Sequence, residues 1–396
     1  MAQRNTLEPP ILIIGAGVAG LVLAQGLRLR SIPFHLFERH SRSHSSQGHR
    51  FRISKDGQTA LDGILSPQLQ SLLRRTAHVR NRVESRYVDA RKLDFAKPQP
   101  VDSESMPVDR AWIRSLTSLN IEDSIEYGKE FESYQVIDER VQVSFIDGSL
   151  VSGKLLVGAD GIKSRARKQL QPDRKLLDLE RWIMWGRTPL TEELKQNISQ
   201  DLLTWCMYLD QESNVQTIVE PMQWSPSTQQ ESGIRLPDYS DYIYWVTCTA
   251  PFQYSKSLPS TVEEKRLFMD EVSKTWQPEL KLLFSSAAHD LSACVPVLSS
   301  KPDIEVCVAN GAGRVTLVGD AAHPMSPMGG SGADTAIRNA AGLAATIADN
   351  GLTTNNISDF EARMEALAKD KIEHSFKGGQ KFWRGKEWTH YTESVL

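Results

Sequence analysis

Three glycines near the start of the chain are spaced for holding phosphate groups. Gly15, Gly17 and Gly20 form a GxGxxG motif between an apolar run at 11–14, which predicts a buried strand, and an apolar-periodic stretch that predicts a helix through residue 30. The first glycine permits a tight turn, the second lets a pyrophosphate approach the backbone, and the third lets helix and strand pack closely. The N-terminus of that helix would offer N–H groups and partial positive charge to the phosphates.

An acidic residue completes this pattern. Residues 34–37 predict a second strand that ends at Glu38, 18 residues after Gly20. A carboxylate in this position can accept hydrogen bonds from both hydroxyls of an adenosine ribose, and it would repel a 2′-phosphate. The unit of strand, glycine turn, helix, strand and terminal Glu therefore predicts a site for the ADP half of FAD or NAD, rather than for NADP.

A second block near the other end of the chain suggests which dinucleotide is bound. The segment 313–324, GRVTLVGDAAHP, predicts a strand that leads into Asp320. This carboxylate would lie near the middle of the cofactor, where a ribityl hydroxyl could donate to it, and a long site in two parts suits the extended FAD molecule. The following PMGGSG, 327–332, opens an alanine-rich helix. Its first N–H groups could face the N1 and O2 edge of the isoalloxazine, where a helix N-terminus stabilises the negative charge of reduced flavin by up to ~2 kcal/mol.

Together, these blocks resemble the FAD-dependent group A aromatic monooxygenases with the p-hydroxybenzoate hydroxylase fold. Three motifs match in order: GAGVAG with Glu38, GADGIKS at 158–164, and GDAAHPMSPMGGSGAD at 319–334. The stretch 109–114, DRAWIR, also resembles the family's helix that bears an arginine close to the flavin. The resemblance covers roughly residues 10–170 and 310–350 and leaves the middle of the chain unmatched.

The resemblance implies a set of cofactor-binding residues. Glu38 would bind the adenosine ribose, and Asp320 would hold the ribityl chain. Asp160 would help shape the place where flavin and nicotinamide meet. The remaining expected contacts are Arg50 and Arg110 along the pyrophosphate and ribityl chain, Pro327, Gly332 and Ala333 along the isoalloxazine, and the glycine turn of Gly15, Gly17 and Gly20.

The last block departs from the family pattern. Many members have Gln, Asn and an acidic residue where this chain has Ser331, Asp334 and Arg338. Near the start of its helix, Asp334 is expected to act as a cap. Its charge close to reduced flavin could also shift the reduction potential.

The resemblance also implies a reaction. NADH or NADPH would reduce FAD, O2 would add at flavin C4a, and the resulting hydroperoxide would hydroxylate an aromatic or polycyclic small molecule. An epoxidase or Baeyer–Villiger type oxygenase acting on a polyketide- or terpenoid-like substrate would share every motif, and so would a flavin reductase that inserts no oxygen. A non-catalytic nucleotide-binding module is a further alternative. The sequence does not distinguish NADH from NADPH.

No side chain is assigned a catalytic role from the sequence. Residues that could hold or deprotonate a phenolic substrate lie in the middle region, and two histidines are further candidates. The candidates are Arg187, Tyr208, Tyr242 and Tyr244, together with His289 and His323, of which His323 is expected to pack within its loop.

The sequence predicts an α/β fold in which a Rossmann-like FAD-binding domain is interleaved with a mostly antiparallel β-sheet substrate domain. We expect residues 1–75, 100–175 and 291–350 to form the first domain, 76–99 and 176–290 the second, and 351–396 a C-terminal helix and tail. Single helices are predicted around 58–73 and over 110–119, and a hairpin over 141–154. Five of the nine tryptophans fall between 182 and 245, where they either suit a sheet or wall a pocket for a flat apolar ligand.

Composition argues against several other functions. The 396 residues carry 46 Lys and Arg against 49 Asp and Glu, for a net charge of −3, which gives no broad electrostatic footprint for nucleic acid or an anionic membrane. The basic stretch 74–92 is expected to be a solvated face or a surface that attracts a nucleotide phosphate. The apolar run 11–27 is broken by glycines, so no stable membrane span is expected. Scattered cysteines predict neither disulfides nor a metal site and suggest a reducing compartment, the cytoplasm; they are Cys206, Cys248, Cys294 and Cys307.

Overall fold

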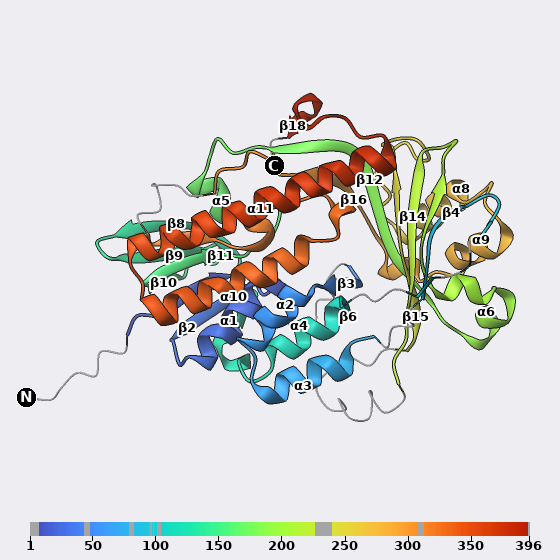
Figure 1. Ribbon diagram of the computed structural model, residues 1–396. Helices are drawn as coiled ribbons and strands as arrows, with labels where there is room; N and C mark the ends of the chain where they lie inside the picture. The colour runs from blue at the N-terminus through green and yellow to red at the C-terminus, as the bar shows by residue number, and fades with distance from the viewer. Residues whose placement is uncertain are drawn as a thin grey trace, which may run out of the picture.

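The computed structural model describes residues 8–42, 48–78, 83–95, 97, 99–100, 104–225, 240–306 and 313–394. Two sheets lie toward opposite ends of the molecule, and the long helix α11 (Thr354–Trp383) runs across one side from the first toward the second (Figure 1). The expected α/β architecture is confirmed. Cys307 lies outside the described residues, and the other three cysteines are buried and unpaired.

The first sheet is parallel throughout. Its order is β17 (Val315–Leu317), β11 (Leu155–Gly158), β1 (Ile11–Ile14), β2 (Phe34–Glu38) and β7 (Ile125–Tyr127). β1 is buried along its whole length, as expected of a parallel strand covered on both faces. The strands predicted near the two ends of the chain are therefore confirmed, and they lie in one sheet with β11 between β1 and β17.

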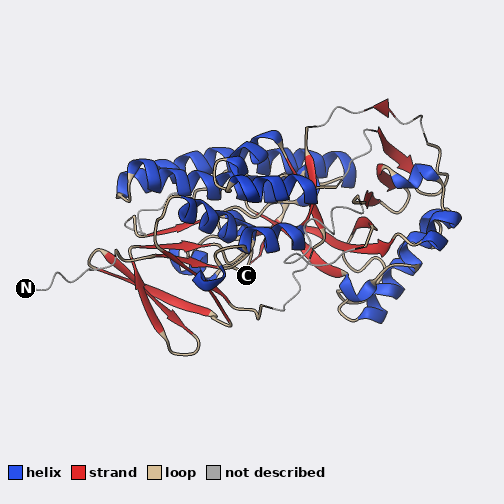
Figure 2. Cartoon of the chain, turned by 90° about the horizontal axis from the view of Figure 1, so that it is seen from below, coloured by secondary structure: helices blue, strands red, loops and turns tan. Residues whose placement is uncertain are grey.

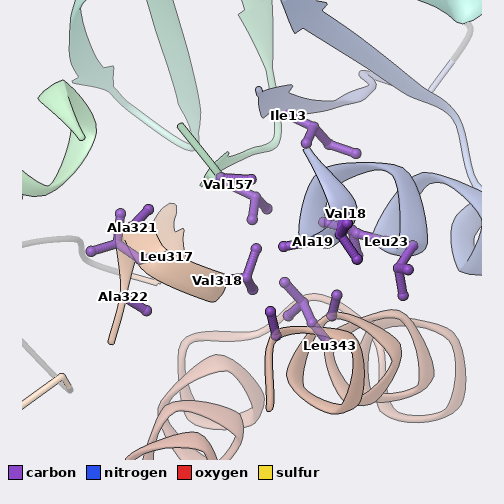
Figure 3. Packing of buried hydrophobic residues seen from close by; sticks show 14 of the residues in the cluster. Ile13, Val18, Ala19, Leu23, Val157, Leu317, Val318, Ala321, Ala322 and Leu343 are labelled. Atoms are coloured by element: carbon purple, nitrogen blue, oxygen red, sulfur yellow. The ribbon is translucent and has the colours of Figure 1, made fainter. Parts of the chain in front are cut away.

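Helices cover one face of the parallel sheet and a meander covers the other. The helices are α1 (Val18–Leu29) and α10 (Gly332–Asn350), whose apolar side chains meet those of β1, β11 and β17 (Figure 3). The meander consists of β8 (Phe131–Ile137), β9 (Arg140–Phe145) and β10 (Leu150–Gly153) and projects from the body in Figure 2. Phe37 of β2 and Phe145 of β9 join the two layers, with ring centroids 4.7 Å apart. The predicted hairpin is confirmed as β9 and β10.

A small two-stranded sheet precedes two helices. β3 (Arg50–Ile53) pairs with β6 (Met106–Asp109), and each leads directly toward a helix, α2 (Lys55–Asp62) or α4 (Arg110–Ser118). The helix predicted at 110–119 is confirmed as α4. The single helix predicted around 58–73 is wrong, because α2 ends at Gly63 and a new helix, α3 (Pro67–Thr76), begins after the capping Ser66 with proline in its first turn.

The second sheet has eight strands and is mostly antiparallel, as predicted. Its order is β16 (Ala293–Ser299), β12 (Leu176–Pro189), β15 (Tyr242–Thr249), β14 (Val215–Met222), β13 (Trp205–Asp210), β4 (Val83–Asp89) and β5 (Gln99–Pro100), with β18 (Thr392–Ser394) on β12. Among the described strands of this second sheet, only β13 and β4 pair in parallel. β16 and β18 extend this sheet beyond residues 76–99 and 176–290, into segments that the expected division placed outside the substrate domain.

The outer face of the large sheet packs against three helices. They are α6 (Glu192–Asn197), α8 (Val262–Val272) and α9 (Pro278–Ser285), and they enclose a second apolar core with Tyr208, Trp245 and neighbouring side chains (Figure 1). The other helical elements are α5 (Arg165–Leu170) and short 3₁₀ turns at Glu122–Ser124, Gln200–Leu203, His289–Leu291, Gly319–Ala321, Pro327–Gly329 and Trp388–His390. Within the ranges given above, no helix combines the length and the apolar character needed to cross a bilayer.

Candidate functional site

The carboxyl ends of four parallel strands meet at one edge of the first sheet. β2 ends at Glu38, β1 runs into the glycine turn, β11 into Asp160 and β17 toward Asp320. Because β2 and β17 are three strand spacings apart at about 4.8 Å each, the two acidic ends of this edge lie roughly 14 Å from one another. One extended dinucleotide can lie across such an edge.

The three glycines of the turn have three different surroundings. Gly15 has φ +106°, and a Cβ there would lie 2.5 Å from the carbonyl oxygen of Ala159 on the neighbouring strand end. A Cβ on Gly20 would lie 2.0 Å from the carbonyl oxygen of Gly15, so helix and turn touch there. A Cβ on Gly17 would meet nothing within 4 Å, which leaves room for a ligand.

The N-terminus of α1 is available to an anion. Gly17 is the N-cap and brings no side-chain cap, and the first turn of α1 contains no acidic residue. The partial positive charge of the helix is therefore not neutralised by the helix's own sequence. The open space at Gly17 and this charge fit the pyrophosphate of a dinucleotide.

Glu38 is fixed at the rim of the glycine turn. Its side chain is buried and accepts hydrogen bonds from the backbone N–H groups of Ala16, at 2.8 Å, and His40, at 2.9 Å. A carboxylate oxygen has more than one acceptor site, so both oxygens can still accept from ribose hydroxyls. The geometry is compatible with the role expected for Glu38.

Asp320 and Arg110 come together from distant parts of the sequence. The side chain of Asp320 is exposed, yet desolvation by the surrounding protein raises the pKa of its carboxyl, against the opposing effect of Arg110 and Arg167. Burial likewise lowers the pKa of Arg110, which Asp320 partly offsets. A ligand can therefore reach Asp320 from solvent, while Arg110 and Arg167 face the same carboxylate.

Two arginines that sequence reasoning missed hold the loop around Asp320. Arg167 is buried and donates to the backbone carbonyls of Asp320, at 3.2 Å, and Ala321, at 3.1 Å. Arg174 donates to the carbonyl of Ala322, and burial lowers its pKa to about 9. No short motif marks these residues, because their acceptors are backbone groups about 150 residues away.

Asp160 is engaged in its own loop. Its carboxylate accepts hydrogen bonds from the hydroxyl of Ser164 and from the backbone N–H of Arg165 at 2.8 Å, where α5 begins. Ser164 in turn caps α5 by accepting from Arg167 N at 2.9 Å. Asp160 therefore shapes the loop beside Asp320 through intramolecular bonds, and its expected role toward flavin and nicotinamide stays a prediction.

Arg50 has a partner that the sequence did not reveal. Its guanidinium pairs with Glu220 of β14 and lies 4.7 Å from the ring centroid of Tyr244. Arg52 donates to the same Glu220 at 2.8 Å. Burial alone would raise the pKa of Glu220, but Arg50 and Arg52 outweigh it and hold that pKa below its ordinary value. β14 of the large sheet is therefore joined by ion pairs to β3, the strand that contains Arg50, an expected contact of the pyrophosphate.

A second buried polar cluster links the same two parts of the molecule. Asp109 caps α4 by accepting from Ala111 N, and it also accepts from the Tyr242 hydroxyl at 2.7 Å. Arg187 lies 3.6 Å from the Asp109 carboxylate and donates to His49 Nδ1 at 2.9 Å. Burial raises the pKa of Asp109, and burial together with Arg187 lowers the pKa of His49 to about 3, so His49 is a neutral acceptor.

The face of the large sheet that carries these residues is also rich in apolar side chains. Strand register aligns Trp185 with Val246, Val246 with Ile218, and Ile218 with Met207. These residues share their face with Arg187, Tyr244 and Glu220, because side chains two positions apart on a strand point the same way. We call the four side chains Trp185, Val246, Ile218 and Met207 the apolar row.

Not every predicted aromatic residue lies on this face. Trp182 and Trp245 belong to the helix-packed core on the outer face. Tyr208 is fully buried in that same core, so the structure places it away from the cofactor edge. Arg187, Tyr242 and Tyr244 remain as side chains on the inner face.

The two candidate histidines are both buried among protein groups. His289 Nε2 contacts the carbonyl oxygen of Phe284 at 2.9 Å beneath the outer helices. His323 is fully buried beside Asn339, 2.9 Å from its amide, and burial lowers the pKa of His323 to about 4. Each ring is thus buried and contacts a neighbouring protein group through its Nε2.

The loop expected beneath the isoalloxazine forms the 3₁₀ turn at Pro327 and the start of α10 at Gly332 and Ala333. The expectation that Asp334 caps α10 is wrong. Its carboxylate instead accepts from Ser54 N, at 2.8 Å, and Ser54 Oγ, at 2.9 Å. Ser54 is the N-cap of α2, and its backbone N–H and hydroxyl provide Asp334 with two donors from outside α10.

Comparison with known proteins shows similarity to proteins that bind FAD. A family model described as FAD binding domain matches residues 299–351. The chain is 30% identical over 98% of its length to the dual O-methyltransferase/FAD-dependent monooxygenase CTB3 of Cercospora beticola, covering 48% of that protein. It is 25% identical to the FAD-dependent monooxygenase phnB of Penicillium herquei, covering 98% of this chain and 93% of phnB. The chain thus spans about half the length of the dual-function relatives it matches.

A solved structure has the same fold. An FAD-containing protein of Photorhabdus luminescens, assigned to the monooxygenases, superposes with a TM-score of 0.79 at 25% identity, covering 95% of this chain and 99% of that one. The parallel sheet, the order of the cofactor motifs along it and these relatives agree with one another. In sequence and fold, the chain is therefore similar to FAD-dependent monooxygenases, and it shares an FAD binding domain with them over residues 299–351.

Proposed function

We propose that the chain uses FAD, NADH or NADPH, and O2 to hydroxylate a flat, uncharged aromatic or polycyclic small molecule. The observation that carries the proposal is the position of Arg110, which interacts electrostatically both with Asp320 and with Tyr244 of the large sheet. Arg110 thus links the cofactor edge to the sheet face that bears the apolar row. The naming of the curated relatives as FAD-dependent monooxygenases supports the same conclusion.

The residues at the cofactor edge fit FAD. Glu38 would hold the adenosine ribose, the turn at Gly17 and the N-terminus of α1 the pyrophosphate, and Asp320 with Arg110 the ribityl chain. The start of α10 at Gly332 would face the isoalloxazine. When bound there, FAD supplies hydride acceptance from the nicotinamide and the activation of O2.

The substrate side is built to bind and to exclude water. The apolar row offers a flat surface to an aromatic ring system. Exclusion of water matters because activated oxygen is otherwise lost as hydrogen peroxide. The protein's contribution on this side is therefore a dry, shaped wall facing the flavin.

Charge pairing on this face argues for an uncharged substrate. Arg50 and Arg52 pair with the two carboxylates of Glu220 and Glu84. Arg187 lies against Asp109. A substrate carboxylate would have to break one of these buried pairs, which costs several kcal/mol when a charge is left without its partner. A phenolic hydroxyl faces no such penalty.

Tyr244 is the polar group placed to meet a phenol. Among the described residues, none forms a hydrogen bond with its hydroxyl, and its ring lies against Arg50. Burial raises the pKa of Tyr244, an effect that Arg50 and Arg110 partly offset. At neutral pH it is therefore a hydrogen-bond donor that can hold and orient a substrate oxygen.

The test is substrate-dependent oxidation of NADH or NADPH by the FAD-loaded protein. Neutral naphthols should stimulate oxidation at least tenfold over the substrate-free rate and yield products heavier by one oxygen atom, about 16 mass units. The matched naphthoic acids that carry a carboxylate should stimulate it less. Nicotinamide oxidation that yields only hydrogen peroxide with every compound would support a reductase instead, and product structures would distinguish hydroxylation from epoxidation or ring expansion.

A further inference from the structure

The first turn of α10 carries an acidic residue whose position is fixed by another helix. Asp334 is the third residue of α10, two positions after Gly332. Its carboxylate accepts from the backbone N–H and the hydroxyl of Ser54 at 2.8 and 2.9 Å, and Ser54 lies 280 residues earlier in the chain. Ser54 is also the N-cap of α2 and accepts from Gly57 N at 3.1 Å. The N-termini of α2 and α10, which lie side by side in Figure 1, thus meet at one carboxylate.

The fit around this carboxylate is tight. A Cβ at Gly57 would lie only 2.1 Å from Asp334 Oδ1, so no larger residue fits at that position of α2 without displacing Asp334. The Asp334 residue is only 6% exposed. Its carboxylate is therefore held in one place.

The charge of Asp334 has no cationic partner among the described residues. Arg338, one turn further along α10, pairs instead with the exposed Asp56 of α2 at 3.3 Å. The donors to Asp334 are a backbone N–H and a hydroxyl, which stabilise the carboxylate but leave its full negative charge in place. That charge sits at the end of α10 whose partial positive charge would otherwise stabilise an anion bound there.

We propose that Asp334, held by Ser54, is a positioning residue that keeps a fixed negative charge at the N-terminus of α10 and thereby lowers the reduction potential of bound FAD. Reduced flavin carries negative charge at its N1 and O2 edge, and Asp334 repels that charge while leaving oxidised FAD largely unaffected. The inference rests on the part of the proposed function that places FAD at the start of α10.

Two substitutions on the same hydrogen bond give opposite expectations. Asp334→Asn removes the charge and keeps the shape, so the reduction potential of bound FAD should rise. A tenfold gain in the affinity for reduced over oxidised FAD is expected, which corresponds to about 30 mV for a two-electron couple. Ser54→Ala removes a donor that stabilises the carboxylate, so the potential should fall. A loosened structure would move both variants in the same direction.

The measurement is an anaerobic reduction of the FAD-bound protein in equilibrium with a reference dye. Asp56→Asn is the matched control, since it removes one negative charge from the exposed side of the α2–α10 contact. For Asp56→Asn, the ratio of the affinities for reduced and oxidised FAD should stay within twofold of the wild-type ratio. A rise for Asp334→Asn no larger than for Asp56→Asn, or shifts of one sign for Asp334→Asn and Ser54→Ala, would overturn the inference while leaving the proposed function standing. Failure of the wild-type chain to bind FAD would overturn both.

Discussion

Tyr242 donates its hydroxyl proton to Asp109 Oδ2 across 2.7 Å, although 133 residues separate them in sequence. Asp109 caps α4, whose first residue is Arg110, and Tyr242 belongs to β15 of the large sheet. The sheet that would hold the substrate is therefore bonded directly to the helix end that presents an expected cofactor contact. Arg187, 3.6 Å from the same carboxylate, reinforces this connection.

Replacing Tyr242 by phenylalanine should weaken the protein measurably. The substitution leaves the buried Asp109 without its hydroxyl donor, and a buried polar group deprived of a partner costs about 1–3 kcal/mol. Urea unfolding would give the change in the free energy of unfolding. Tyr208→Phe is the control, because it removes an equally buried hydroxyl that donates to no carboxylate in the described part of the chain. Equal losses in the free energy of unfolding for Tyr242→Phe and Tyr208→Phe would contradict the role given to the Tyr242–Asp109 bond.

The glycine turn predicts two different outcomes for the same substitution. Gly17→Ala should cost about 1 kcal/mol or less in stability, since alanine is a poorer N-cap than glycine but its Cβ meets nothing within 4 Å. It should weaken FAD binding at least tenfold by filling the phosphate space. Gly15→Ala should destabilise the fold itself by more than about 2 kcal/mol, because φ is +106° and the Cβ would strike Ala159 O. Fluorescence titration with FAD and thermal unfolding separate the two effects. Normal FAD affinity in Gly17→Ala would rule out this position for the pyrophosphate.

His323 should make the protein sensitive to mild acid. Burial lowers its folded pKa to about 4, whereas an exposed histidine titrates near 6.5, so its contribution to stability is complete above pH 6.5 and is lost as pH falls toward 4. Between pH 7 and pH 5 this amounts to about 2 kcal/mol. In His323→Gln that part of the pH dependence should disappear from urea unfolding curves. An unchanged difference between the two pH values would show that His323 does not stay neutral in the folded state.

Arg167 is expected to be essential for the loop that carries Asp320. Its guanidinium donates to the carbonyls of Asp320 and Ala321, and Arg167→Met would leave these buried acceptors without donors. A loss of about 2–4 kcal/mol in the free energy of unfolding is expected, together with weaker FAD binding. The neighbouring Lys168 is exposed, so Lys168→Met should change neither quantity. If Arg167→Met and Lys168→Met had the same free energy of unfolding and the same FAD affinity, the role of Arg167 would be disproved.

The parts of the fold that leave a local pattern in the sequence were predicted well. The buried strands at both ends of the chain, the glycine turn and the alanine-rich helix each have a characteristic run of residues, and all are present. The break between α2 and α3 was missed because an apolar periodicity masked Gly63 and the Ser66 cap. Side-chain direction on strands was also beyond the sequence reading, so Tyr208 and Tyr244 looked alike although they lie on opposite faces.

Long-range partners account for the rest of what the sequence did not reveal. Arg50 was expected from a motif, but its pairing with Glu220 joins segments 170 residues apart and leaves no local pattern. Asp334 was expected to cap its own helix, yet Ser54 provides better donors from a distant helix. Such contacts follow from how the sheets and helices pack, and they emerge only once the fold is known.

The central claim is that Glu38 and Asp320 hold the two ends of a single FAD. The most direct test is a crystal structure of the chain in complex with FAD. We expect one FAD per chain, with the adenosine ribose within hydrogen-bond distance of the Glu38 carboxylate and the ribityl chain within hydrogen-bond distance of Asp320. An FAD molecule that touches one of these carboxylates and lies away from the other would contradict the account.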